Sequence, residues 1–291
     1  MQLAPVTTTL GSEVTGIDLR TDLTDALGEQ IHDALVDRGV LVFRDQPIDP
    51  AAHLRLAAAL GELGARHPLY PSVTGFPQVN IIPNDAGHPP ESEVWHSDLS
   101  CKVDPPFASV LRAELIPPVG GDTLWVDMRA ACAAIPPALR AQIEGRRALH
   151  SLSHGFRFLE EHGHADRLER LASTRDDTTA EHPVIVRHPV SGVEVLFVNE
   201  SFTEHLVGSE PAESGPLLEQ LFALARNPRF QMRLRWQRNT IAIWDNWATQ
   251  HFASGDHYPM HDREMQRVTV ASSRRAGLFS DHDGARGELR R

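Results

Sequence analysis

The strongest constraint on the fold is a long series of short apolar segments separated by Pro and Gly turns. Two of these segments flank Pro189-Val190-Ser191-Gly192, which predicts a hairpin. Many short strands with few long helices are typical of a sandwich or jelly roll, whereas a doubly wound fold needs strand–helix alternation throughout. We therefore expect a mainly β chain of the α+β class, with a jelly-roll core decorated by helices. The strands are expected near 79–82, 94–98, 107–115, 123–127, 147–152, 184–188, 193–199, 229–236, 240–245 and 267–273.

Helical signals lie mainly in the first sixty residues. Val14, Ile17 and Leu19 alternate with polar residues as in a half-buried strand. A helix should follow from about Thr24 to Gly39, then a buried strand over 40–43. Asp49-Pro50 predicts a second helix that runs to about Gly64, because a cap is followed by a first-turn proline. Further helices are expected from Pro136-Pro137 and over about 214–226, with Ser214 as the cap and Pro216 in the first turn.

The remaining segments suggest one domain over 1–273 and a polar tail over 274–291. The charged, His-rich stretch 154–181 has weak helical periodicity and is the best candidate for a mobile lid. Its histidines, with His150 just before it, are expected to be solvated rather than a second metal site.

Composition excludes several classes of protein. A formal net charge of −11 without a basic block argues against nucleic acid or an anionic membrane as partner, and no apolar run could span a bilayer. Two cysteines rule out a disulfide framework or a thiolate zinc cluster. The N-terminus lacks the pattern of a secretory signal, so we expect a cytoplasmic protein. Sixteen histidines are the unusual count and direct attention to metal or proton chemistry.

The first candidate for chemistry is Trp95-His96-Ser97-Asp98. On a strand, His96 and Asp98 would project from the same face and offer two ligands to a divalent metal. A third imidazole would complete the two-histidine, one-carboxylate set of non-haem Fe(II) oxygenases. Taken alone, the motif is better explained by a buried histidine hydrogen-bonded to its neighbouring carboxylate.

Two later segments support the metal reading. His251 follows the strand-like segment 241–246, and Arg263 lies twelve residues after His251. This spacing allows the chain to leave one strand, turn and return on the adjacent strand, with Arg263 beside the metal. A guanidinium there is suited to one end of a dicarboxylate whose other end chelates the ion. Thr123, after Gly120-Gly121-Asp122, offers a hydroxyl to the same carboxylate, although the glycines alone indicate only a turn.

Together these motifs resemble the taurine dioxygenase-like (TauD/TfdA) family of Fe(II)/2-oxoglutarate-dependent dioxygenases. The likeness runs from Leu10 to Thr269 and implies the double-stranded β-helix (cupin-like) form of the jelly roll. It also implies a homo-oligomer, a dimer or tetramer. The motifs that carry it are Trp95-His96-Ser97-Asp98, Gly120-Gly121-Asp122-Thr123-Leu124-Trp125, His188-Pro189-Val190-Ser191-Gly192, Phe197-Val198-Asn199-Glu200, Trp244-Asp245-Asn246 and Thr249-Gln250-His251.

Carried over by position, the resemblance implies that His96, Asp98 and His251 bind Fe(II). Arg263, assisted by Thr123, would hold the distal carboxylate of 2-oxoglutarate. With O2, the co-substrate would be converted to succinate and CO2 while the substrate is hydroxylated. In taurine-type enzymes the hydroxylated carbon carries the sulfonate, so the product collapses to an aldehyde and sulfite.

The substrate is expected to be a small organic anion. His67 and Arg267 match family positions near the substrate's acidic group, with Tyr70 close by. Arg267 could instead form an internal salt bridge, and His67 could be a loop histidine bonded to backbone. Glu91 and Ser92 stand where taurine dioxygenase has an Asp-Asn pair near the substrate ammonium. This departure favours an alkylsulfonate, a sulfate ester or an aryloxyalkanoate at least as much as taurine.

Two other functions use the same residues. A cupin-like protein could bind a metal without oxygenase activity, but would not need the pair Arg263 and Thr123. A zinc hydrolase could use the triad to activate water.

Overall fold

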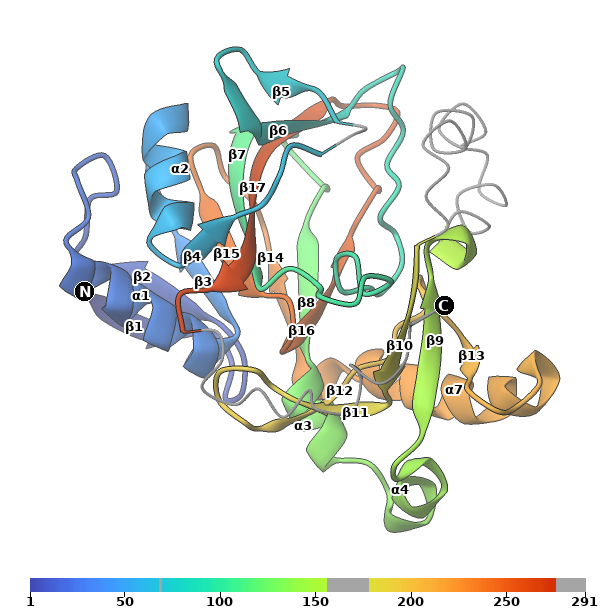
Figure 1. The fold of residues 1–291 in the computed structure, drawn as a ribbon. Helices are drawn as coiled ribbons and strands as arrows, with labels where there is room; N and C mark the ends of the chain where they lie inside the picture. The colour runs from blue at the N-terminus through green and yellow to red at the C-terminus, as the bar shows by residue number, and fades with distance from the viewer. Residues whose placement is uncertain (68–69, 156–177, 276–291) are drawn as a thin grey trace, which may run out of the picture.

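The computed structural model describes residues 1–67, 70–155 and 178–275. Within these ranges the largest sheet has nine strands in the order β1-β2-β3-β15-β7-β17-β6-β5, with β4 paired to β17 (Figure 1). Neighbouring strands are antiparallel except β2 and β3, which are parallel. The strands are β1 (Gln2–Pro5), β2 (Ser12–Thr15), β3 (Val40–Phe43), β4 (Gly61–Leu63), β5 (Ser72–Val73), β6 (Phe76–Asn84), β7 (Ala108–Leu115), β15 (Ile241–Asp245) and β17 (Arg263–Ser273).

A smaller sheet packs on one face of the large sheet and completes the jelly roll. Its order is β14-β8-β16, with bounds Gln231–Leu234, Thr123–Asp127 and Thr249–Ala253. Trp125 and Met232 from this sheet form one buried cluster with Trp244 and Met265 of the large sheet. Burial of these side chains is the main force that holds the two sheets together. The predicted mainly β jelly-roll fold is confirmed.

Helices cover the opposite face of the large sheet. Helices α1 (Asp25–Arg38) and α2 (Pro50–Ala58) lie against it in Figure 1. Alternation along β15 explains this arrangement, because Ile243 joins the cluster with Leu35 of α1 while Trp244 points into the sandwich. Thr24 caps α1 as expected, since its side chain accepts a hydrogen bond from the Leu27 amide, and Gly39 ends it.

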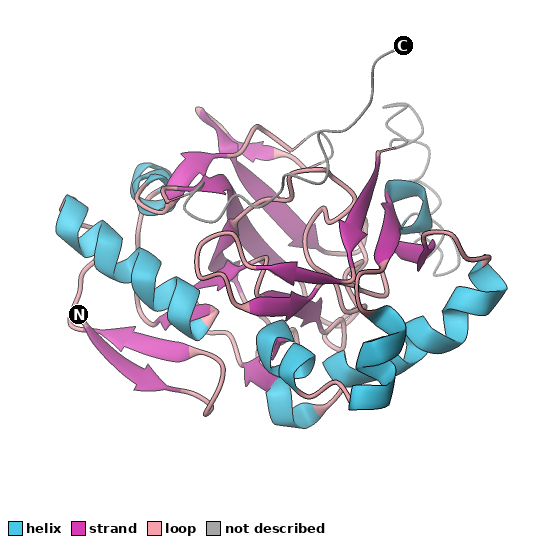
Figure 2. Cartoon of the chain, turned by 60° about the horizontal axis from the view of Figure 1, so that its bottom comes forward, coloured by secondary structure: helices cyan, strands magenta, loops and turns pink. Residues whose placement is uncertain are grey.

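The remaining elements pack below the sandwich and are visible in Figure 2, where helices line the lower edge. Strands β11 and β12 form the hairpin that the sequence predicts around 189–192. The bounds are α3 (Met128–Ala133), α4 (Pro137–Ile143), β9 (Arg147–Ser151), β10 (Thr179–Pro183), β11 (Ile185–Arg187), β12 (Glu194–Leu196), β13 (Thr203–Leu206), α7 (Pro211–Ala225) and the 3₁₀ turn η1 (Pro228–Phe230).

Two expectations near the N-terminus are wrong. The helix from Pro50 stops at Ala58 instead of about Gly64, and β4 follows it. The cause is tertiary, because Gly61 lies against β17 so closely that a Cβ would overlap the Ser272 carbonyl oxygen. The strand expected over Val14–Leu19 ends at Thr15, where Gly16 turns the chain with a φ of 76°.

Three later expectations also need correction. Residues 94–98 do not form a strand, since only His96 makes a bridge there. Helix α7 begins at Pro211, so Ser214 and Pro216 lie inside it, and the Ser214 hydroxyl bonds to the Glu210 carbonyl. Of the expected lid 154–181, residues 156–177 lie outside the described ranges, but 179–181 belong to β10. The expected tail likewise lies outside them from residue 276.

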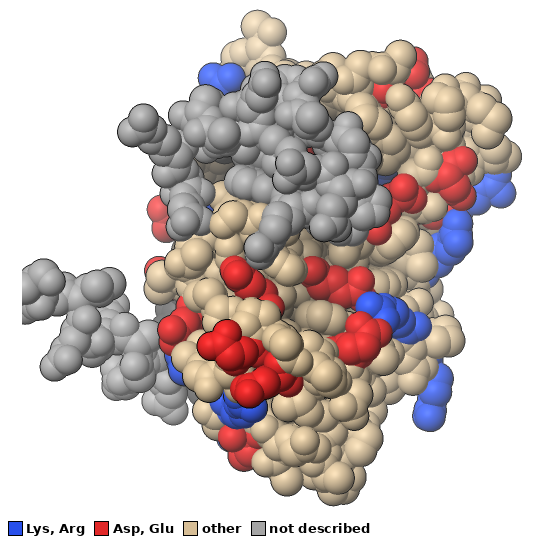
Figure 3. Space-filling model, turned by 90° about the vertical axis from the view of Figure 1, so that its right-hand side faces the viewer, with Lys and Arg blue, Asp and Glu red and all other residues tan. Residues whose placement is uncertain are grey.

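The surface matches the acidic composition on the face viewed in Figure 3. Acidic side chains gather over the lower half of that face, with few basic ones among them. In the described part of the chain, no helix combines the length and apolar character needed to cross a membrane.

The buried histidine of α2 predicts a pH dependence of stability. The His53 ring donates from Nε2 to the Val110 carbonyl at 3.0 Å, and burial lowers the pKa of His53 to about 4. The unfolded chain takes up a proton near pH 6.5, whereas the folded chain takes it up only near pH 4. Stability contributed by neutral His53 is therefore lost as pH falls through this window, by about 2 kcal/mol between pH 7 and 5.

The test is His53→Gln, which keeps a donor for the Val110 carbonyl but cannot titrate. Urea unfolding at pH 7 and pH 5 should show that the variant loses about 2 kcal/mol less than the parent chain over this interval. An equal loss in both proteins would contradict the assignment.

Candidate active site

Three side chains distant in the sequence converge at one end of the sandwich. His96 Nε2 and His251 Nε2 each lie 3.9 Å from Asp98 Oδ1, and the two imidazole centroids are 4.0 Å apart. Among the described residues this is the single cluster of three or more potential metal-binding side chains, with all ligand atoms within 4.8 Å. Separations near 4 Å are too long for hydrogen bonds, and two imidazoles with one carboxylate are the ligand types that a divalent metal takes. The set therefore fits a divalent metal.

Backbone contacts between the two segments bring these ligands together. His251 lies on β16, and its amide and carbonyl pair with those of His96 at 2.8 and 3.1 Å. This isolated bridge replaces the expected strand and still directs both imidazoles to one place. Trp244 closes the inner side, with its ring centroid 4.8 Å from that of His251.

The protonation states also suit metal binding. The Nδ1 of His96 donates to the Val94 carbonyl at 2.9 Å, which leaves Nε2 unprotonated. Burial lowers the pKa of His96, and burial together with His96 lowers the pKa of His251 to about 3. Burial would raise the pKa of Asp98, but Arg267 and the two histidines outweigh it and hold that pKa well below its usual range. At neutral pH the site thus presents two neutral imidazoles and a carboxylate.

Arg263 is a buried cation without a counter-ion in the described part of the chain. Only 5% of its surface is exposed, it lines the cavity, and burial lowers its pKa to about 10. No hydrogen bond or ion pair reaches its guanidinium from any described residue, and Nε is an orphaned donor. Such a group indicates a binding point for an anion, because a buried charge without a partner is costly.

Thr123 and the glycine turn complete this end of the cavity. The Thr123 hydroxyl accepts a hydrogen bond from the Trp236 indole at 2.9 Å, so its own proton is free to be donated into the cavity. Gly121 has a φ of 69°, and a Cβ there would lie 3.1 Å from Cδ of Arg263. Glycine is therefore needed both for the turn and for its approach to the arginine.

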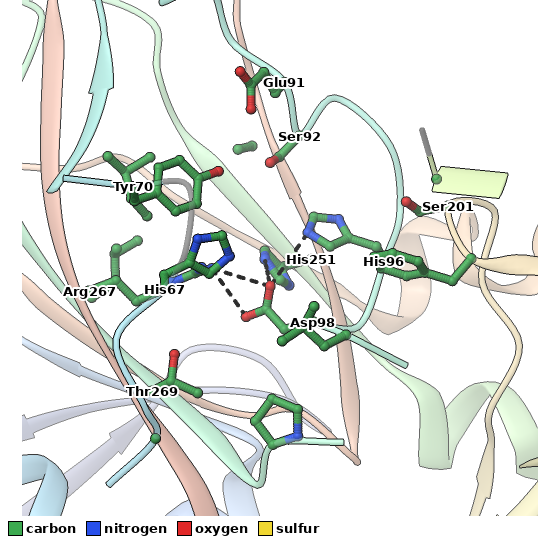
Figure 4. Close-up of a pocket in the computed structure, with 18 of the residues that line it drawn as sticks. His67, Tyr70, Glu91, Ser92, His96, Asp98, Ser201, His251, Arg267 and Thr269 are labelled. Atoms are coloured by element: carbon green, nitrogen blue, oxygen red, sulfur yellow. Dashed lines mark hydrogen bonds and ion pairs between the residues drawn. The ribbon is translucent and has the colours of Figure 1, made fainter. Parts of the chain in front are cut away.

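Arg267 adopts the internal salt bridge that the sequence left as an alternative. Its Nη1 lies 3.3 and 3.5 Å from the two carboxylate oxygens of Asp98, while its Cζ lies 5.7 Å from the Tyr70 ring centroid. The His67 ring lies 4.6 Å from Tyr70, and Figure 4 shows these groups beside Asp98. The structure thus brings together every residue predicted to meet the substrate's acidic group.

One cavity of about 510 Å³ contains all the predicted site residues, including Glu91 and Ser92. Both lie at the upper side of the view in Figure 4, away from Asp98. Strand β17 forms a long wall, because its alternate residues face inward: Arg263, Met265, Arg267, Thr269 and Ala271.

Sequence reasoning missed three residues that support the site. Trp236 orients Thr123, Ser109 donates to Asp98 Oδ2 at 3.0 Å, and Asn246 bonds to the Asp98 backbone. Asn246 belongs to a motif noted in the sequence, but nothing local indicated its partner. No sequence signal pointed to Ser109 or Trp236.

Comparison with known proteins is consistent with this geometry. The family model described as "Taurine catabolism dioxygenase TauD, TfdA family" matches residues 2–269. An alkylsulfatase of Acinetobacter baylyi is 32% identical over 93% of this chain and 85% of its own. An alpha-ketoglutarate-dependent sulfate ester dioxygenase of Pseudomonas putida is 33% identical over 96% of this chain and 92% of its own length. The crystal structure of a taurine dioxygenase from Burkholderia xenovorans matches with a TM-score of 0.79 and 32% sequence identity. The match covers 94% of this chain and 89% of that one.

The two arginines of β17 should respond oppositely to neutralisation in protein free of metal and co-substrate. Arg263→Met removes a buried cation that forms no ion pair with any residue of the described ranges, and it should raise the free energy of unfolding by roughly 1–3 kcal/mol. Arg267→Met leaves the buried carboxylate of Asp98 without its guanidinium and should lower it by about 3 kcal/mol.

Urea unfolding of the two variants and the parent chain, with chelator present, measures both effects. Each variant serves as the control for the other, because both remove the same group from one face of one strand. A loss of stability in Arg263→Met equal to that in Arg267→Met would show that Arg263 has a counter-ion.

Proposed function

The chain belongs to the TauD/TfdA dioxygenase family, and on that basis we propose that it is an Fe(II)- and 2-oxoglutarate-dependent dioxygenase of small organic anions. The reaction consumes O2 and 2-oxoglutarate, releases succinate and CO2, and hydroxylates the substrate. Residues 1–273 act as one catalytic domain. The resemblance further supports a homo-oligomer, a dimer or tetramer, and the two cysteines without a disulfide framework are in keeping with a cytoplasmic location.

The metal is held by His96, Asp98 and His251. Two imidazoles and one carboxylate would leave coordination positions for other ligands, as the same ligand set does in non-haem Fe(II) oxygenases. Bound Fe(II) supplies the redox chemistry by which O2 and 2-oxoglutarate generate the oxidant. Burial of both imidazoles keeps bulk water from this centre.

The observation that carries the proposal is the guanidinium of Arg263, which lies in the same cavity as the triad and has no hydrogen-bond or ion-pair partner among the described residues. Two N–H groups of Arg263 can take the distal carboxylate of 2-oxoglutarate, and the Thr123 hydroxyl can donate a third hydrogen bond. A metal-binding cupin without oxygenase activity, or a zinc hydrolase, needs no such clamp.

The substrate's acidic group is placed at Arg267, His67 and Tyr70. Arg267 is 14% exposed at its side chain and faces the cavity, so its remaining N–H groups are open to an anion. Alkylsulfonates such as taurine, sulfate esters and aryloxyalkanoates all fit this chemistry. Two relatives described above are named for alkyl sulfates or sulfate esters, which supports sulfate esters as a substrate class. Hydroxylation of the carbon attached to the sulfonate sulfur, the sulfate-ester oxygen or the ether oxygen then leads to C–S or C–O cleavage.

Glu91 and Ser92 line the far side of the cavity and are proposed to contact the rest of the substrate. Ser92 is fixed at its carbonyl by the Ala253 amide at 3.0 Å. A carboxylate at position 91 suits a substrate with a cationic or hydrogen-bonding group distant from its acid.

The test is a succinate assay with Fe(II), ascorbate and 2-oxoglutarate, in which sulfonates, sulfate esters and aryloxyalkanoates are supplied in turn. At least one class should give succinate in excess of the substrate-free rate, with one sulfite, sulfate or phenol released per coupled turnover. Asp98→Ala should abolish it. Zn²⁺ should inhibit, which distinguishes the enzyme from a zinc hydrolase.

Absence of substrate-dependent succinate across all three classes would contradict the proposal. Anaerobic titration of 2-oxoglutarate into the Fe(II)-protein gives an independent readout, since chelation should produce a weak visible charge-transfer band.

A further inference from the structure

The metal carboxylate lies on a segment that no β-ladder supports. Asp98 is outside every strand of the described chain, and Leu99 after it has a φ of 51°, in the left-handed region. His96 has a backbone bridge to His251, but Asp98 has no backbone partner of this kind. Some other group must hold Asp98 at a fixed distance from the two imidazoles.

Asn246 supplies the missing pairing through its side chain. Its Oδ1 accepts from the Asp98 amide at 2.7 Å, and its Nδ2 donates to the Asp98 carbonyl at 2.9 Å. A carboxamide that bonds both the N–H and the C=O of one residue reproduces the reciprocal pairing of two antiparallel strands. We propose that Asn246 is a positioning residue that fixes the Asp98 carboxylate for metal binding.

Asn246 is itself rigidly held. It is fully buried, its backbone amide donates to the Phe107 carbonyl at 2.9 Å, and Nδ2 also donates to the Pro106 carbonyl at 3.0 Å. The preceding Asp245 forms a buried pair with His188 at 2.9 Å. Asp245 also accepts hydrogen bonds from the amides of residues 247 and 248, so the turn that presents Asn246 is closed on both sides.

The consequence for the metal is geometric. Residues 96–98 are tied to 246–251 at three successive points: the His96–His251 bridge, a hydrogen bond from the Ser97 hydroxyl to the Thr249 carbonyl at 3.0 Å, and the Asn246 contacts. Asn246 and His251 belong to one rigid segment, so Asn246 sets the separation of the carboxylate from the second imidazole. Loss of the clamp loosens the backbone of Asp98 and leaves its carboxylate held only by Ser109 and Arg267, while the bridge between His96 and His251 does not depend on the clamp.

This inference rests on the proposed metal site, and its experiment measures metal affinity rather than turnover. Co²⁺ is titrated into chelator-treated full-length protein and followed by its visible absorption, for the parent chain and for Asn246→Ala. We expect Asn246→Ala to bind Co²⁺ at least 10-fold more weakly and with an altered visible spectrum, the range typical for groups that orient metal ligands.

A matched control is Gln46→Ala, because Gln46 is another side-chain amide that accepts from one backbone amide (Leu19, 2.8 Å) and donates to one carbonyl (Arg44, 3.2 Å). It lies outside the cavity, so Co²⁺ affinity should stay within twofold of the parent. If Asn246→Ala does not fold, Asn246→Asp is measured in its place. This variant keeps the size and the acceptor oxygen of the side chain but loses the hydrogen bonds that Nδ2 donates to the carbonyls of Asp98 and Pro106. It should also weaken Co²⁺ binding at least 10-fold.

Folded Asn246→Ala with parental affinity, or equal losses of affinity in Asn246→Ala and Gln46→Ala, would overturn the role of Asn246 alone. Failure of the parent chain to bind Co²⁺ would instead refute the metal site, and with it the proposed function.

Discussion

The site depends on the pairing of charges on side chains that are mostly withdrawn from water. Asp98 carries one negative charge, and Arg263 and Arg267 carry two positive charges, while burial keeps both imidazoles neutral. These three side chains therefore leave one positive charge in excess. A divalent metal raises this excess to three, and a dicarboxylate together with a monoanionic substrate neutralises it. Full occupancy is the state in which every buried charge has a partner.

This charge balance gives a physical reason for an ordered assembly. Metal binding weakens the attraction of Asp98 for Arg267 and makes that guanidinium available to another anion. By linkage, an anion at Arg267 must then favour the metal by the same factor. The substrate class follows from the same logic, because a neutral molecule would leave Arg267 without a partner once Asp98 is shared with the metal.

Much of the fold could be predicted from the sequence, because short apolar segments and turn residues act locally. Thr24 and Gly39 delimit α1 as expected. The failures have tertiary causes: Gly61 ends α2 early because β17 approaches it too closely for a side chain. Residues 94–98 have the composition of a strand, but the Asn246 side chain replaces the neighbouring strand at Asp98.

The convergence of His96, Asp98 and His251 could be predicted even though the strand premise was wrong. Their chemistry and family motif are local, whereas the groups that hold them in place are not. Asn246 is 148 residues from Asp98 and Trp236 is 113 from Thr123, and no local pattern encodes such hydrogen bonds. Candidate ligand residues can therefore be predicted from a single sequence more easily than the residues that hold them in position.

The one-faced wall of β17 also sets a length scale. Arg263 and Arg267 are four residues apart on an extended strand, so their Cα atoms are separated by about 13 Å. The strand thus fixes the distance between the two anion-binding positions proposed for the co-substrate and for the substrate. Deleting a single residue between them would turn one guanidinium toward the helices, so evolution can retune this spacing only in steps of two residues.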